Sequence, residues 1–206
     1  MRECLAVACK RLRLTLALGM TLSAPRSESL AFDAVRTLVL YSVAEVQSGY
    51  AKTIWVVAED TSFGVSDDGR GHAIERMVSD SPYLKFIYTH LDFPFGSNQA
   101  APIQLQGLGM SLLNTLCREL TVTVRKPEAT LHLLFQDGKF MRSERVDVAS
   151  EETGNTVAGT IKPQLQTAAI DLPQLHAWLL GVLCATSSLR IFLNNHELRP
   201  YPQSGA

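Results

Sequence analysis

The sequence predicts an α+β fold, a two-layer α/β sandwich in which helices cover one face of a mixed, mostly antiparallel sheet. Residues 30–47 and 172–185 repeat apolar side chains at helical spacing, and segments between them alternate in antiparallel pairs. The 206 residues are 46% hydrophobic and 19% charged, a balance that favours a packed core and excludes a disordered chain. We expect one domain over residues 30–199, with residues 1–29 as an N-terminal arm or first strand and residues 200–206 as a flexible tail.

The first half of this domain combines a long helix with a hairpin. Ser29 is a suitable N-cap for the helix, and Gly49 is a suitable terminator. The β-branched and aromatic segment TIWVVA predicts a strand. The expected elements are a helix over 30–47, a hairpin of strands 53–58 and 63–66, and weaker helices over 72–79 and after Pro82.

The second half opens with residues 91–106, which have no periodicity. A segment of this length favours a functional lid over a plain connection. Turns at Lys126–Pro127 and Asp137–Gly138 then separate antiparallel strands. The expected elements are a helix over 108–117, strands over 120–125, 130–136, 141–148 and 157–162, a helix over 172–185 and a strand over 189–193.

Charge and cysteine content limit the function classes. Lys plus Arg number 19 and Asp plus Glu number 20, so the net charge is −1 and direct DNA binding by this domain alone is not expected. The four cysteines form no CxxC pair, which favours reduced thiols inside a cell. No apolar run is long enough to span a bilayer, so no membrane association is expected.

The N-terminal segment leaves localisation with an alternative. Its basic residues and the apolar run 14–22 are similar to a signal peptide, but Leu22 occupies a position where cleavage needs a small residue. We therefore expect a cytoplasmic protein, with an exported or organellar form as the alternative.

Two glycine motifs carry the candidate chemistry. DDGRG at 67–71 follows a strand directly, where glycines let the backbone approach a flat ligand and a carboxylate accepts a hydrogen bond from an amino group. QGLG at 106–109 opens a helix, whose amide groups and dipole form an anion site. Each motif alone is equally explained by a turn, but their order and separation favour a ligand site.

This combination resembles the GHKL, or Bergerat, ATP-binding family of gyrase B, MutL, heat-shock chaperones and histidine kinases. The resemblance is strongest to the ATPase subdomain of gyrase B and topoisomerase IV B subunits. Asp67–Gly71 matches their DDGRG motif, and GLGMSLLNTL at 107–116 is similar to their GVGVSVVNAL. TGNTV at 153–157 resembles the start of their TGTxVxFxP strand, with about one extra residue.

The resemblance implies a role for each matching residue. Asp67 would bind adenine, assisted through water by Thr156 or, as the alternative, by Thr160. Arg70 would pair with Glu45. The remaining nucleotide-binding residues would be Gly71 beside the base, Gly107 and Gly109 at the phosphates, and Ile74 and Met110, which would line the pocket or simply pack in the core.

The long helix departs from the family pattern EVVDNxxDE. Its catalytic glutamate, which activates the attacking water, becomes Thr37, and its magnesium-binding asparagine becomes Tyr41. Threonine has no carboxylate to act as a base, and a phenol is a poor magnesium ligand. We therefore expect no catalytic residue and no metal ligand at these positions, with ATP or ADP as the ligand and no magnesium.

Three functions follow from these expectations. The first is a domain that binds adenine nucleotide with impaired hydrolysis and is part of, or derived from, a type II DNA topoisomerase subunit. The second is a pseudo-ATPase, a protein-interaction module that binds no nucleotide because side chains such as Tyr41 fill its pocket. The third is an active enzyme with a base from elsewhere, for which Glu45 is the nearby carboxylate. Since gyrase B domains dimerise through an N-terminal arm that is short here, we expect a monomer, with another protein chain as an additional partner.

Overall fold

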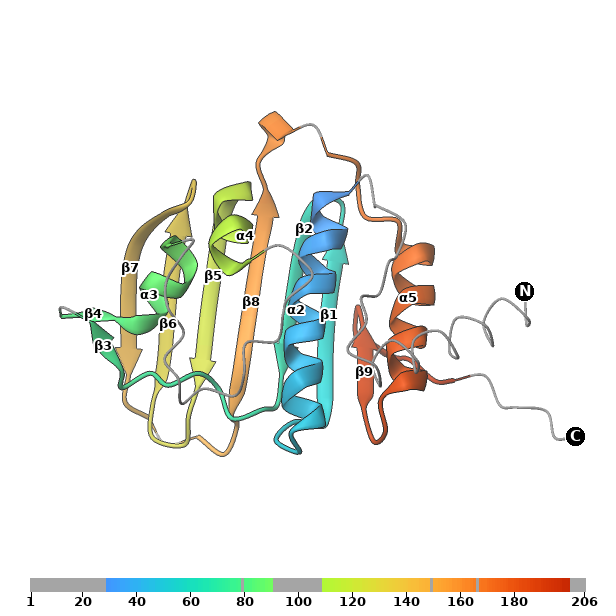
Figure 1. The fold of residues 1–206 in the computed structure, drawn as a ribbon, viewed down its shortest axis with the longest axis horizontal. Coiled ribbons are helices and arrows are strands. Elements are labelled where there is room, and N and C mark those ends of the chain that lie inside the picture. The colour runs from blue at the N-terminus through green and yellow to red at the C-terminus, as the bar shows by residue number, and fades with distance from the viewer. Residues whose placement is uncertain (1–28, 79, 91–108, 149, 166, 201–206) are drawn as a thin grey trace, which may run out of the picture.

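A single large sheet organises the protein. The computed structural model describes residues 29–78, 80–90, 109–148, 150–165 and 167–200. Eight strands form the sheet in the order β10-β9-β1-β2-β8-β5-β6-β7, and all neighbours are antiparallel except β1 and β9. Helices lie against one face of it (Figure 1), which confirms the predicted two-layer α+β sandwich.

The longest helix and the central hairpin lie where the sequence predicts them. The elements are α2 (Leu30–Gln47), β1 (Thr53–Glu59) and β2 (Ser62–Asp67). Ser29 caps α2 because its hydroxyl accepts a hydrogen bond from the N–H of Phe32 at 3.2 Å. The apolar side of α2 packs on β1 and β2, so the C-terminal half of the helix lies over the last residue of β2, Asp67.

The segment after β2 is not the helix that the sequence predicts over residues 72–79. Its backbone continues away from the sheet to a small hairpin and a short helix, β3 (Met77–Val78), β4 (Ser81–Pro82) and α3 (Tyr83–Thr89). The backbone N–H of His72 donates to the side chain of Asn155 at 3.0 Å, which holds the start of the segment extended. Only Ile74 is buried among the described residues 72–78, so a helix here would have no apolar face.

The strands of the second half form an antiparallel meander. The elements are α4 (Met110–Leu116), β5 (Cys117–Arg125), β6 (Thr130–Gln136) and β7 (Lys139–Val146). A tight turn at Asp137 and Gly138 joins β6 to β7, as predicted. The lid expected over 91–106 and Gly107 lie outside the described residues, as do most of the expected arm and tail.

The last part of the described chain adds one strand to the middle of the sheet and two at its edge. The elements are β8 (Gly154–Ile161), the 3-10 turn η1 (Pro163–Leu165), α5 (Leu172–Ala185), β9 (Arg190–Leu193) and β10 (His196–Glu197). β8 fits between β2 and β5, whereas β9 pairs in parallel with β1. The side-chain amide of Asn194 bonds to both backbone groups of Ala58, which fixes the end of β9 to β1.

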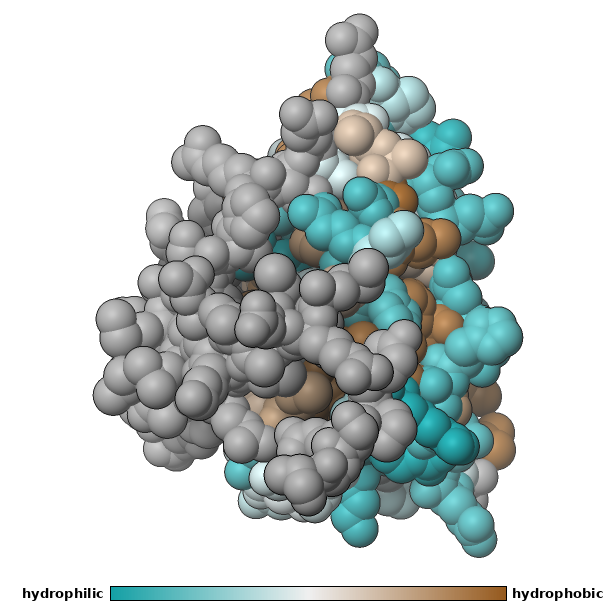
Figure 2. Space-filling model, turned by 90° about the vertical axis from the view of Figure 1, so that its right-hand side faces the viewer, coloured by the Kyte–Doolittle hydropathy of each residue, from teal (hydrophilic) through white to brown (hydrophobic). Residues whose placement is uncertain are grey.

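The surface on the α5 and β9 side is mixed. Figure 2 shows hydrophilic residues over most of the described surface in this view, with hydrophobic residues between them. Among the described residues, no helix combines the length and apolar character needed to cross a bilayer.

Candidate functional site

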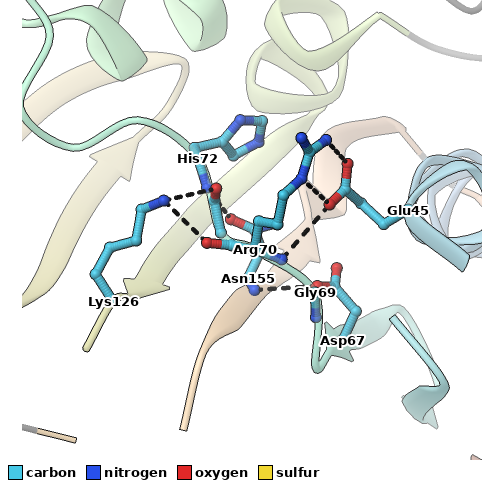
Figure 3. Close-up of polar contacts among 8 residues, drawn as sticks. Glu45, Asp67, Gly69, Arg70, His72, Lys126 and Asn155 are labelled. Atoms are coloured by element: carbon cyan, nitrogen blue, oxygen red, sulfur yellow. Dashed lines mark hydrogen bonds and ion pairs between the residues drawn. The ribbon is translucent and has the colours of Figure 1, made fainter. Parts of the chain in front are cut away.

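Asp67 lies at the end of β2 with only 3% of its surface exposed. Its Oδ1 accepts hydrogen bonds from the N–H of Gly69 at 3.0 Å and of Asn155 at 3.3 Å, and its Oδ2 accepts one from the hydroxyl of Ser42 at 2.9 Å. Burial raises the pKa of Asp67, and these three bonds act in the opposite direction. We call these four residues the acidic end of the site; Figure 3 shows its Asp67–Asn155 part.

Two glycines allow the backbone to close around the acidic end. A Cβ on Gly154 would lie 1.9 Å from the backbone oxygen of Asp67, and Gly154 has φ +125°. A Cβ on Gly71, where φ is +68°, would lie 2.8 Å from the backbone oxygen of Arg125. Both positions therefore need glycine for chain packing. The close backbone approach at Gly71 is made by β5 and β8.

An ion pair joins α2 to the DDGRG segment. Arg70 donates to both carboxylate oxygens of Glu45, from Nε at 3.1 Å and from Nη2 at 2.8 Å (Figure 3). The guanidinium of Arg70 also lies 3.6 Å from the ring centre of Tyr50. Hydrogen bonding from Arg70 lowers the pKa of Glu45 below its usual range. The ion pair holds the last turn of α2 against the acidic end.

A small cavity lies beside Asp67. Its volume is about 20 Å³, room for roughly one water molecule. Aliphatic and thioether side chains form part of its wall, and polar or aromatic ones form the rest: Leu38, Val65, Met110 and Val157, together with Tyr41, Ser42, Asp67, His72, Tyr88 and Asn155.

Tyr41 and His72 form what we call the aromatic wall of this cavity. Their ring centres are 5.6 Å apart at an interplanar angle of 45°. Burial lowers the pKa of His72 to about 4, so its ring is neutral at pH 7. Burial, with nearby acidic groups, raises the pKa of Tyr41 to about 12, so its phenol stays protonated. The aromatic wall is therefore uncharged.

Thr37 lies one turn before Tyr41 but does not line the cavity. It is 1% exposed, and its hydroxyl donates to the backbone oxygen of Asp33 at 2.9 Å. The side chain is part of the core beneath α2.

Comparison with known proteins identifies relatives of this chain. No family model matches the chain. It is 30% identical to the DNA gyrase B protein of Streptococcus pyogenes serotype M3 over 154 residues, which cover 72% of this chain and 24% of that protein. The DNA gyrase B protein of Streptococcus pneumoniae serotype 4 is 28% identical over 184 residues, covering 86% of this chain and 28% of the relative. This chain is homologous to gyrase B. It spans about a quarter of the length of these curated relatives.

A solved structure shows the same fold. The topoisomerase IV ATP-binding domain of Francisella tularensis, determined with a small-molecule inhibitor, has a TM-score of 0.67 and 21% identity, covering 80% of this chain and 83% of that one. The gyrase B homologue therefore has the GHKL fold.

Two of the residues expected at the gyrase-like site lie elsewhere. Thr156 is on the face of β8 opposite Asp67, where it bonds to Ser66 and accepts from Nη1 of Arg125 at 2.9 Å. The alternative, Thr160, bonds to Ser62 at 3.0 Å. Neither reaches Asp67, because strand side chains alternate between faces. Ile74 is buried in the core and is not among the residues lining the cavity.

Of the remaining expected residues, some lie at or beside the cavity, whereas Gly109 of the QGLG motif does not line it. Met110 lines the cavity, and Glu45 and Arg70 form their ion pair beside it. Gly109 is exposed at the N-terminus of α4, where a Cβ would touch nothing within 4 Å. Gly107 lies outside the described residues.

The cavity residues that were not predicted from the sequence include Ser42, His72 and Asn155. Ser42 is one turn of α2 before Val46 and three residues before Glu45, a spacing that places it near the same helix face. Asn155 would have been found by aligning TGNTV with TGTxV directly, without an extra residue. His72 follows DDGRG immediately, but no pattern indicated that its ring would face the cavity.

Proposed function

We propose that this gyrase B homologue recognises an adenine-type ligand through Asp67 and does not hydrolyse ATP efficiently. The supporting observation is the hydrogen bonding of Asp67. A carboxylate has about four acceptor positions, and the described residues fill two on Oδ1 and one on Oδ2. The position that remains on Oδ2 suits one N–H donor, such as the exocyclic amino group of adenine. Leu38, Val65 and Val157 supply apolar wall for a flat ring.

Inefficient hydrolysis is proposed from Thr37 and Tyr41 of α2. Thr37 offers a hydroxyl that already donates to Asp33, so it does not act as a general base. The phenol of Tyr41, with a pKa of about 12, does not suit magnesium, which prefers carboxylate, carbonyl and water oxygens. The residues present thus do not fit the metal that the fold family implies. We propose that the chain is part of, or derived from, a type II DNA topoisomerase subunit.

Calorimetric titration tests this function. Adenosine, ADP and ATP are titrated separately into the wild type, Asp67→Asn and Asp68→Asn. Asp68 is the matched control, because its carboxylate bonds to the N–H groups of Lys52 and Thr53. We expect wild-type and Asp68→Asn binding of at least one ligand, weakened at least tenfold in Asp67→Asn. Equal affinity in the two variants would contradict the role of Asp67.

A turnover assay tests the second half of the proposal. Losing a general base slows a reaction by about 10²- to 10⁴-fold. Phosphate release should therefore be at least about 10²-fold slower than that of a gyrase B ATPase domain measured in parallel. Gyrase-like turnover by the unmodified chain would refute the assignment of Thr37.

A protein-interaction module is the second candidate. It is favoured by the size of the cavity, which holds about one water molecule while Tyr41 and His72 are in contact. In this case none of the three ligands would produce heat at millimolar concentration, and another protein chain would be the partner.

A further inference from the structure

The groups around the cavity have hydrogen-bonding capacity and charge that suit the base of a nucleotide better than its phosphates. This inference rests on the proposed function. The acidic end has one described acceptor position left, on Oδ2 of Asp67. This position recognises an N–H donor. It repels phosphate oxygens, because these carry negative charge and accept hydrogen bonds rather than donate them.

The aromatic wall offers no charge to offset phosphates. The ring of His72 is neutral at pH 7, and its backbone N–H is engaged with Asn155. Tyr41 is protonated, and its ring contacts that of His72. These two rings suit the faces of a heterocycle better than a polyanion.

Among the described residues, the two cations near the cavity, Arg70 and Lys126, are engaged elsewhere. Arg70 forms two hydrogen bonds with Glu45 and lies over the ring of Tyr50. Lys126 donates from Nζ to the backbone oxygens of Arg70 at 2.9 Å and of Gly71 at 3.3 Å (Figure 3). A phosphate near the aromatic wall would have to break one of these arrangements to gain a counter-charge from Arg70 or Lys126.

We propose that the cavity takes an uncharged heterocycle with an exocyclic amino group, of the adenosine class, and that the rings of Tyr41 and His72 exclude magnesium-bound triphosphate. The contact between the two rings leaves about 20 Å³, so a base enters when the rings move apart. Tyr41 is only partly buried on α2. Tyr41 is thus a specificity-determining residue of the proposed site.

Calorimetry with matched ligands tests the class. For the wild type at pH 7, we expect adenosine to bind at least tenfold more tightly than ATP with magnesium. Inosine, which has an oxygen in place of the 6-amino group, should bind at least tenfold more weakly than adenosine, because it leaves Oδ2 of Asp67 without its donor. This comparison needs no variant and is independent of any effect on folding.

Three variants test Tyr41. Tyr41→Ala should reduce the adenosine-to-ATP affinity ratio at least fivefold, whereas Tyr41→Phe keeps the ring and should keep the ratio. Tyr50→Ala is the control, because Tyr50 is 51% exposed and lies outside the cavity. An unchanged ratio in Tyr41→Ala would overturn the role of the ring.

The outcomes separate this inference from the proposed function. Wild-type ATP binding with magnesium as tight as adenosine binding overturns the inference and leaves recognition of adenine by Asp67 intact. Equal binding of inosine and adenosine overturns the use of Oδ2. No heat with any ligand, in the wild type and in Tyr41→Ala, overturns the proposed function itself.

Discussion

The two sides of the cavity are built on different principles. At the acidic end, Asp67 accepts hydrogen bonds from three places in the chain: Ser42 of α2, Gly69 two residues further along, and Asn155 of β8. At the aromatic wall, Tyr41 and His72 are held by ring contact. One turn earlier, Thr37 satisfies its hydroxyl within its own helix. The last turns of α2 make the polar contacts with the DDGRG segment, whereas Thr37, nearer the middle of the helix, is buried in the core.

The largest expected effect comes from breaking the backbone packing of the acidic end. Gly154→Ala places a methyl group 1.9 Å from the backbone oxygen of Asp67 at a φ that alanine avoids. We expect a loss of more than about 4 kcal/mol in the free energy of unfolding, measured by urea titration.

Gly64→Ala is the matched control for this substitution. Its Cβ would meet Ala158 and Val57 at ordinary contact distances of 3.6 and 3.8 Å. Its stability should be unchanged or higher by up to about 1 kcal/mol. A small effect in Gly154→Ala would show that β2 and β8 are free to separate at this point.

The next largest effect comes from a comparison of Asp67, at the acidic end, with Thr37, in the buried part of α2. Asp67→Ala removes an acceptor from three buried donors and should cost about 3 kcal/mol. Thr37→Val keeps the shape of the side chain and removes one helix-internal hydrogen bond, so we expect about 1 kcal/mol or less. Urea titration of both variants measures the difference. Equal losses would mean that Thr37 is as necessary to the polar structure as Asp67.

The pH dependence of the free energy of unfolding tests whether His72 of the aromatic wall is neutral. Burial lowers the pKa of His72 to about 4, while a histidine in the unfolded chain titrates near 6.5. Its contribution to stability is therefore complete above pH 6.5 and is lost as the pH falls towards 4. Glu45 opposes this shift and Lys126 adds to it. We expect a loss of about 1 to 2 kcal/mol between about pH 7 and about pH 4.5 that is specific to His72.

The measurement is the free energy of unfolding of wild type and His72→Gln at both pH values. Taking the difference between the two proteins removes contributions from Asp67 and other carboxylates. The same pH dependence in both proteins would count against a neutral His72 at the cavity.

The smallest effect concerns the Glu45–Arg70 ion pair. A double-mutant cycle with Glu45→Gln and Arg70→Met should give a coupling of about 0.5 kcal/mol, because half of the Arg70 side chain is in solvent. The exposed pair of Arg145 and Asp147 serves as the comparison and should show no measurable coupling. We expect the coupling energy between Glu45 and Arg70 to disappear at high salt. A coupling energy of zero already at low salt would contradict the ion pair.

The sequence predicted those parts of the fold and the site that depend on local patterns. The bounds of α2 follow from Ser29 and from apolar periodicity, and the β6–β7 turn follows from Asp137–Gly138. The resemblance to gyrase B was inferred from short motifs of the same kind, and the homology itself extends over 154 residues at 30% identity.

The predictions that were wrong depend on strand register or on contacts with residues far away in the sequence. One assumed extra residue led the sequence analysis to name Thr156 rather than Asn155, and in a strand such a step changes the face. The helix expected over 72–79 competes with a hydrogen bond from His72 to Asn155, 83 residues away. The volume left beside Tyr41 depends on how side chains from five elements pack, which no sequence pattern encodes.

The parallel pairing of β1 with β9 bears on how the chain folds during synthesis. Ala58 and Asn194, which lock these strands together, are 136 residues apart. Until β9 has been synthesised, one edge of β1 has no strand to pair with. Late closure of so long a loop favours slow folding.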